Sequence, residues 1–94
     1  MTYTASSHAL VRMGQRYYAM ADGVDAKDNS ECAKWVKANP EDAALLTGLI
    51  TSATKRAVKN GAKVNGQGHL AVNQYKVVIT SDRRNYGYII KTVI

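Results

Sequence analysis

The residues with the clearest chemical potential form a basic, tyrosine-containing segment near the end of this 94-residue chain. Ser81-Asp82-Arg83-Arg84-Asn85 has the composition of a turn, and Tyr86 and Tyr88 follow it. A guanidinium group can bind a phosphate through two hydrogen bonds or stack on a base, and a tyrosine ring offers a flat surface beside it. Exposed Arg side chains at turns are also common without function, so this segment alone does not establish a binding site.

Charge differs sharply between the two parts of the chain, whose net charge is +6. Residues 1–54 carry five bases and six acids, whereas residues 55–94 carry eight bases and one acid, Asp82. Such asymmetry indicates binding to a polyanion, because a merely solubilising surface usually intersperses both signs. The predicted nucleic-acid or acidic-partner contacts are Lys55, Arg56, Lys59, Lys63, Lys76, Arg83, Arg84, Tyr86 and Tyr88.

Other kinds of site find little support in the sequence. Structural zinc needs four ligands, and His8, His69 and Cys32 are too isolated to supply them. Gly66-Gln67-Gly68-His69 lacks both the strand-to-helix context and the Gly-Lys-Ser/Thr ending of a phosphate-binding loop. We therefore predict no catalytic residue, no metal and no cofactor, and we do not expect an enzyme.

The same residue types predict where the protein resides. A single cysteine cannot form an internal disulfide, which favours a reducing compartment. The N-terminal residues lack the basic and apolar regions of a signal peptide, and no stretch approaches the ~20 apolar residues of a membrane span. The expectation is a cytoplasmic protein without membrane contact.

The elements that must position the basic residues begin with a helix from Ser7 to Ala21. Its apolar residues recur at three- and four-residue steps and are predicted to face the core: Leu10, Met13, Tyr17 and Met20. Ser6 or Ser7 suits the N-cap, and Gly23 lies where a helix commonly ends.

Two more helices are predicted before residue 61. A short one runs from about Glu31 to Ala38 and turns Cys32, Trp35 and Val36 inward. Asn39-Pro40-Glu41-Asp42 predicts the start of a long one, which ends near Asn60 with Gly61 as its terminator.

The faces of the long helix differ in character. Leu46, Ile50, Ala53 and Ala57 line the predicted buried face, which Leu45 and Leu49 broaden. Lys55 and Lys59 point away from it, at the end of the helix where cations also favour the helix dipole. That purely structural role competes with a binding role.

Residues 62–94 have the composition of strands. Asn65-Gly66 suits the turn of a short hairpin within residues 62–72, and two further strands, Tyr75–Thr80 and Tyr86–Ile94, flank the basic turn. We predict one α+β domain over residues 1–94, with a helical part (1–61) and a basic β part (62–94). Three N-terminal helices would precede a small antiparallel hairpin or sheet. The same order of elements occurs in a winged helix, so the fold could be winged-helix-like by topological analogy.

Two functions fit these patterns. The first is a small nucleic-acid-binding protein acting through phosphate contacts, with DNA favoured over RNA. The alternative is a phage or mobile-element inhibitor that blocks an acidic groove of a host protein or nucleoprotein complex, with Tyr3, Tyr75, Tyr86 and Tyr88 as anchors. Because the chain ends in an apolar strand that is either central or an exposed edge, we also expect a homodimer.

Overall fold

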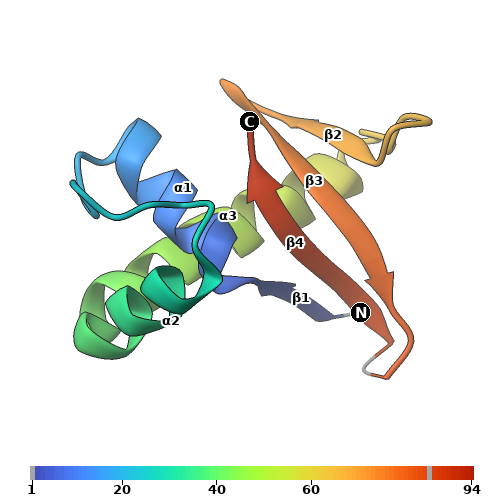
Figure 1. Cartoon of the computed structure of the whole chain (residues 1–94). Coiled ribbons are helices and arrows are strands. Elements are labelled where there is room, and N and C mark those ends of the chain that lie inside the picture. The colour runs from blue at the N-terminus through green and yellow to red at the C-terminus, as the bar shows by residue number, and fades with distance from the viewer. Residues whose placement is uncertain (1, 85) are drawn as a thin grey trace.

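The computed structural model describes residues 2–84 and 86–94, and these form an α+β fold (Figure 1). The elements are β1 (Thr2–Ala5), α1 (Ser7–Tyr17), α2 (Asn29–Ala38), α3 (Pro40–Lys59), β2 (His69–Val72), β3 (Tyr75–Asp82) and β4 (Gly87–Val93). The sheet has the order β1-β4-β3-β2, in which β1 is parallel to β4 and the other pairs are antiparallel. The predicted fold class is confirmed at this level.

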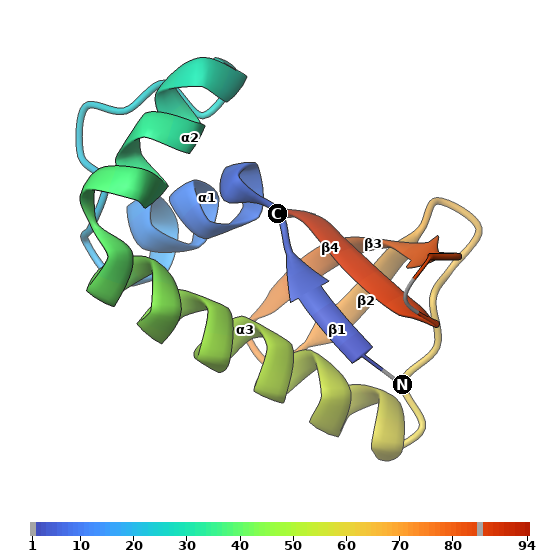
Figure 2. The ribbon, with the colours of Figure 1, turned by 90° about the horizontal axis from the view of Figure 1, so that it is seen from below.

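One face of the sheet packs against helices α1 and α3. Alternate residues of the strands turn inward, because side chains in a strand point to opposite faces in succession. The main core joins inward strand residues to α1 and α3: Leu10, Met13, Leu46, Ile50, Leu70, Val77, Ile79 and Ile90. Helix α2 packs on α1 at one end of the molecule and encloses a smaller core around Val11 and Cys32 (Figure 2).

Strand β1 is the largest departure from the predicted element order. It lies ahead of the helices in the chain and pairs with β4, so the N-terminal part contributes to the sheet as well as to the helical layer. This pairing is so close that a Cβ atom on Gly87 would lie 1.9 Å from the carbonyl oxygen of Thr2. A four-residue strand whose partner lies more than 80 residues away leaves no periodic signal in the sequence.

Helix α1 is shorter than predicted. Ser6 is its N-cap, as expected, and accepts a hydrogen bond from the backbone N–H of Ala9. The helix ends at Tyr17 rather than near Gly23, because Ala19 adopts a left-handed conformation (φ 52°). The N–H of Met20 then donates to the carbonyl of Gly14 at 2.8 Å, so the chain turns back onto the last turn of the helix.

Helices α2 and α3 lie close to their predicted boundaries. Asp28 caps α2, and α3 begins at Pro40 and is followed by Gly61 in a left-handed conformation (φ 97°). The predicted width of the buried face of α3 is wrong, however. Leu45 and Leu49 are exposed, at 50% and 37%, because the sheet and α1 cover a narrower stripe of the helix than its apolar residues suggested.

The hairpin predicted around Asn65-Gly66 is also wrong. Strand β2 instead pairs with β3 through the two-residue turn Asn73-Gln74, in which Asn73 has a positive φ of 53°. The Asn65 carboxamide oxygen accepts bonds from the backbone N–H groups of Gln67 and His69 and shapes a loop before β2. Both turns contain Asn, which adopts turn conformations readily, so composition alone could not show which of them joins two strands.

The final strand lies inside the sheet, between β1 and β3. Of the two positions expected for it, the central one is correct, so β4 is not an edge that could pair with a second copy, as the expected homodimer required. The basic turn joins β3 to β4 as predicted, with Asn85 outside the described residues.

Candidate nucleic-acid interface

Charge is segregated along the molecule. Acidic residues gather near α2 and the start of α3, and the chain contains none between Asp42 and Asp82. The end of α3 and the β3–β4 turn lie at the opposite end (Figure 2). That end carries the exposed cations Lys55, Arg56 and Lys59 on α3 and Arg83 and Arg84 at the turn.

A shallow hollow lies between α3 and β1. Lys55, Thr51 and Ser52 line it from the helix, and Thr2 and Tyr3 line it from the strand, around a volume of about 320 Å³. Lys55 reaches this hollow because its position on the helix turns it away from the stripe formed by Leu46 and Ile50.

The hollow continues toward the hairpin tip through two stacked rings. Tyr3 and Tyr88 lie opposite each other in the parallel register, with ring centroids 5.5 Å apart and ring planes inclined by 26°. Tyr88 also lines a second hollow of about 320 Å³ with Arg83 and Tyr86. We call this run of five residues, Lys55, Tyr3, Tyr88, Arg83 and Tyr86, the cationic strip.

Its aromatic members differ in exposure. Tyr86 is 90% exposed at the tip, whereas Tyr3 and Tyr88 are half-buried. Burial, with a smaller contribution from Tyr88, raises the pKa of the Tyr3 phenol above its ordinary value of 10.0. The stacked pair lies between two cations, and Tyr3 keeps its proton at neutral pH, a combination that suits a base and its flanking phosphates.

The remaining predicted contacts are divided among other surfaces. Arg84 is exposed beside Arg83, and Lys59 and Lys63 are exposed at the end of α3 and in the loop that follows. Lys76 precedes the inward-facing Val77 in β3, so it lies on the sheet face opposite the helices. Arg56 lies on the flank of α3 that faces the end of α1 and the β2–β3 turn. The strip therefore unites four of the nine predicted residues: Lys55, Arg83, Tyr86 and Tyr88.

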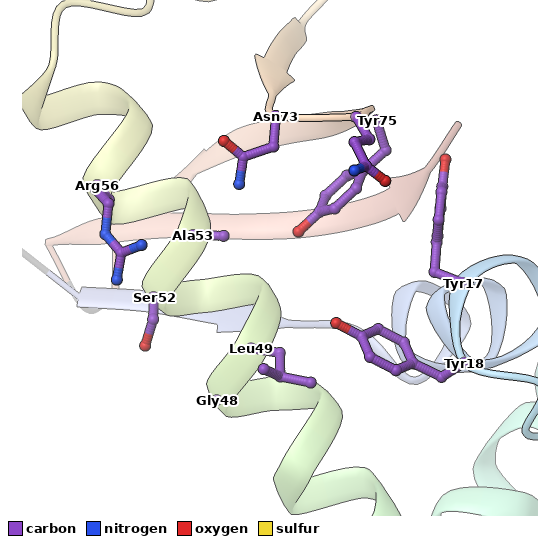
Figure 3. Close-up of a pocket in the computed structure, with 10 residues that line it drawn as sticks. Tyr17, Tyr18, Gly48, Leu49, Ser52, Ala53, Arg56, Asn73 and Tyr75 are labelled. Carbon is purple, nitrogen blue, oxygen red and sulfur yellow. The ribbon is translucent and has the colours of Figure 1, made fainter.

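A third and larger hollow, the tyrosine groove, lies on the flank of α3 that faces the end of α1 and the β2–β3 turn (Figure 3). It encloses about 760 Å³ between α3, the end of α1 and the β2–β3 turn. Three tyrosines line it, Tyr17, Tyr18 and Tyr75. Helix α3 contributes Gly48, Leu49, Ser52, Ala53 and Arg56, and the turn contributes Asn73 and Gln74.

Two of the three tyrosines of this groove, Tyr17 and Tyr75, are held in place by contacts with their neighbours. Tyr17 donates a hydrogen bond from its hydroxyl to a main-chain oxygen of Ile94 at 3.0 Å, and its ring centroid lies 5.0 Å from that of Tyr75. Burial, followed by the neighbouring Tyr18 and Tyr17, raises the pKa of Tyr75 above 10.0. Sequence reasoning missed Tyr17 and Tyr18 as surface residues, because Tyr17 shares the helical spacing of the core stripe and Tyr18 carries no signal at all.

Elsewhere the described residues offer little reactive chemistry. Cys32 is buried, and its Sγ lies 3.6 Å from the carbonyl oxygen of Ala26. Burial and the nearby carboxylates of Asp28, Asp25 and Glu31 raise the pKa of this thiol, which disfavours the nucleophilic thiolate. In the described part of the chain, no three His, Cys, Asp or Glu side chains gather where they could hold a metal ion.

No helix within residues 2–84 and 86–94 combines the length and apolar character that crossing a bilayer requires. Comparison with protein-family models, with curated proteins and with solved structures finds no match to this chain.

Proposed function

We propose that the protein binds nucleic acid through phosphate contacts centred on the cationic strip. The observation that carries this proposal is the position of the stacked Tyr3–Tyr88 pair between Lys55 on one side and Arg83 with Tyr86 on the other. A polyanion with flat bases is the ligand class that matches both properties at once. DNA is the ligand we favour, and RNA is the close alternative.

The distribution of charge supports an approach by one end of the molecule. The strip lies far from the acidic residues near α2, so a polyanion would be attracted to the basic end and repelled from the other. Glu41 and Asp42 occupy the first turn of α3, which is the end that a recognition helix inserts into the major groove. We therefore propose docking by the second half of α3 and the hairpin tip, in place of base reading as in a winged helix.

The test reverses the two charges at the tip, with Arg83→Glu and Arg84→Glu in one variant. We expect affinity for every sequence to fall about tenfold or more, and the salt dependence of binding to flatten by about two units on a log–log plot. Fluorescence anisotropy over a salt series measures both quantities.

A matched control carries the same change of charge at the other end of the molecule. Lys34 and Lys37 are exposed on α2, and Lys34→Glu with Lys37→Glu should leave most of the affinity intact. Thermal unfolding checks that both variants remain folded. Equal losses in the two variants would mean that net charge alone drives binding, and an unchanged affinity in the tip variant would refute the role of the tip.

The second candidate function is inhibition of a host protein or nucleoprotein complex by a phage or mobile-element protein. One observation favours it: large side chains stand exposed on several elements, with Tyr86 at the tip and Leu45 and Leu49 on α3. Affinity capture from a host lysate separates the two candidates. A single stoichiometric protein that remains bound after nuclease treatment would favour inhibition.

A further inference from the structure

The tyrosine groove combines three kinds of chemistry that a nucleotide requires. Tyr18 and Tyr75 direct their hydroxyl groups toward α3 across the groove, and so present ring surfaces inside it (Figure 3). Asn73 and Gln74 place carboxamides at its wall, and carboxamides can both donate to and accept from the edge of a base. Arg56 supplies the one cation among the lining residues.

The size and stiffness of the groove fit a base with its sugar and phosphate. Its volume of about 760 Å³ lies within the range of roughly 300–1,000 Å³ that small-ligand sites occupy. The Tyr17 hydroxyl is tied to Ile94, and the Tyr17 and Tyr75 rings pack on each other, so little conformational entropy remains to be lost when a ring stacks on a ligand.

A continuous path joins this groove to the cationic strip. Ser52 lines both hollows, since it lies at the outermost position of α3 between its two flanks. Lys55 and Arg56 lie about one helical turn further along α3, each on its own flank. Gly48 and Ser52 are small, and among the described residues no atom other than those of the chain neighbours and the helix backbone lies within 4 Å of a Cβ built on Gly48, so a chain of phosphates can approach the helix closely there.

The stacking surfaces distinguish between forms of nucleic acid. Bases inside a duplex are stacked on each other and cannot reach a recessed ring, whereas the bases of a single strand are free to do so. An acidic protein segment would also match Arg56. Such a segment would match the carboxamides and the three rings less well than a base does, because a base offers both a flat ring and hydrogen-bonding edges.

From these observations we propose that the ligand is a single-stranded nucleic acid, with one unstacked base in the tyrosine groove and its backbone crossing α3 at Ser52 toward the cationic strip. This inference rests on the proposed function and adds to it the strandedness of the ligand and a second contact surface.

The test compares an oligothymidine of about 12 nucleotides, a length that one small domain can bind, with a duplex of equal length. Tyr18→Ala should weaken binding of the single strand by about 5- to 100-fold, because it removes a stacking ring, and should leave duplex binding unchanged. Tyr18→Phe keeps the ring and should retain the affinity of the parent. Tyr18 is 40% exposed at the end of α1, so neither variant disturbs the core.

A crosslinking measurement gives an independent readout. Iodouracil placed in the same strand and irradiated should attach to Tyr17, Tyr18 or Tyr75, and mass spectrometry of the digested complex identifies the site. Attachment only at Tyr86 or Tyr88 would overturn the inference.

The remaining outcomes separate this inference from the function beneath it. Suppose that the parent binds both the oligothymidine and the duplex, and that the Arg83→Glu, Arg84→Glu variant binds neither. If Tyr18→Ala then binds both ligands as the parent does, the inference fails while the proposed function stands. If the parent binds neither ligand, both fail. A last outcome would assign the groove to a protein partner. If the parent binds no oligonucleotide, and Tyr18→Ala abolishes capture of a host protein that remains bound after nuclease treatment, the inference is wrong.

Discussion

The two hollows beside α3 share Ser52, but they differ in the elements that form them and in the side chains that line them. Long-range pairing of β1 with β4 assembles the cationic strip, which presents cations from two separate elements around a stacked pair. A helix cap and a two-residue turn assemble the tyrosine groove, which presents three rings and one cation. Lys55 and Arg56 are neighbours in the sequence but belong to different surfaces, because consecutive helical residues are about 100° apart.

The largest effect should come from Gly87→Ala, which breaks the strip and spares the groove. A methyl group at this position would overlap the Thr2 carbonyl, so β1 must leave the sheet or the sheet must distort. We expect a loss of about 3 kcal/mol in the free energy of unfolding, measured by urea denaturation, and rapid hydrogen exchange at the amides of β1.

Gly66→Ala is the control for this substitution. Gly66 has a non-positive φ, and in the described part of the chain only its own neighbours lie within 4 Å of a built Cβ, so stability should change by no more than about 0.5 kcal/mol. Unaltered exchange in β1 of the Gly87→Ala variant would show that β1 does not depend on the close approach.

A smaller effect should separate the neighbours Lys55 and Arg56. Lys55→Gln removes a phosphate contact that single strands and duplexes both use, so affinity for both should fall by several-fold and the log–log salt slope by about one unit. Arg56→Gln removes a contact inside the tyrosine groove and should weaken single-strand binding alone. Anisotropy titrations with the two ligands distinguish these results, and identical behaviour of the variants would contradict the division into two surfaces.

The smallest effect concerns alkaline pH, where each surface holds one tyrosine with a raised pKa, Tyr3 in the strip and Tyr75 in the groove. A raised pKa in the folded protein means that the unfolded chain loses these protons first. The contribution to stability is therefore complete below about pH 10 and declines as pH rises through the folded-state pKa. Tyrosinate absorbance should show late-ionising groups, and Tyr75→Phe should remove one of them. Ionisation of every tyrosine at the ordinary value would contradict the burial of these two rings.

Local signals in the sequence predicted the helices well. Pro40 with Glu41 and Asp42 placed the start of α3, and Ser6 placed the start of α1, because caps depend on residues within a few positions of the helix end. The end of α1 was missed, since a non-glycine residue, Ala19, adopts the left-handed conformation there. An alanine in the sequence gives no indication that the residue will adopt this conformation.

Nonlocal features could not be predicted in the same way. Strand β1 has four residues, and its partner is specified by the fit of Thr2 against a glycine far along the chain. The contact residues were predicted from their charge, and local patterns assigned them to the outer face of the long helix, the segment after it and the hairpin tip. Their division into a strip, a groove and the opposite face of the sheet depends on helix rotation and on strand register.

The sequence by itself determined the α+β class, the position of α3 and the excess of positive charge after residue 54. These follow from composition, helical period and capping, which act over a few residues. Only the tertiary structure decided that Tyr3 meets Tyr88, that Tyr17 and Tyr18 face a hollow and that the final strand is central. The physical reason is that stacking and parallel pairing join residues far apart in the chain. Local residue preferences do not specify such contacts, because they depend on closing a long loop.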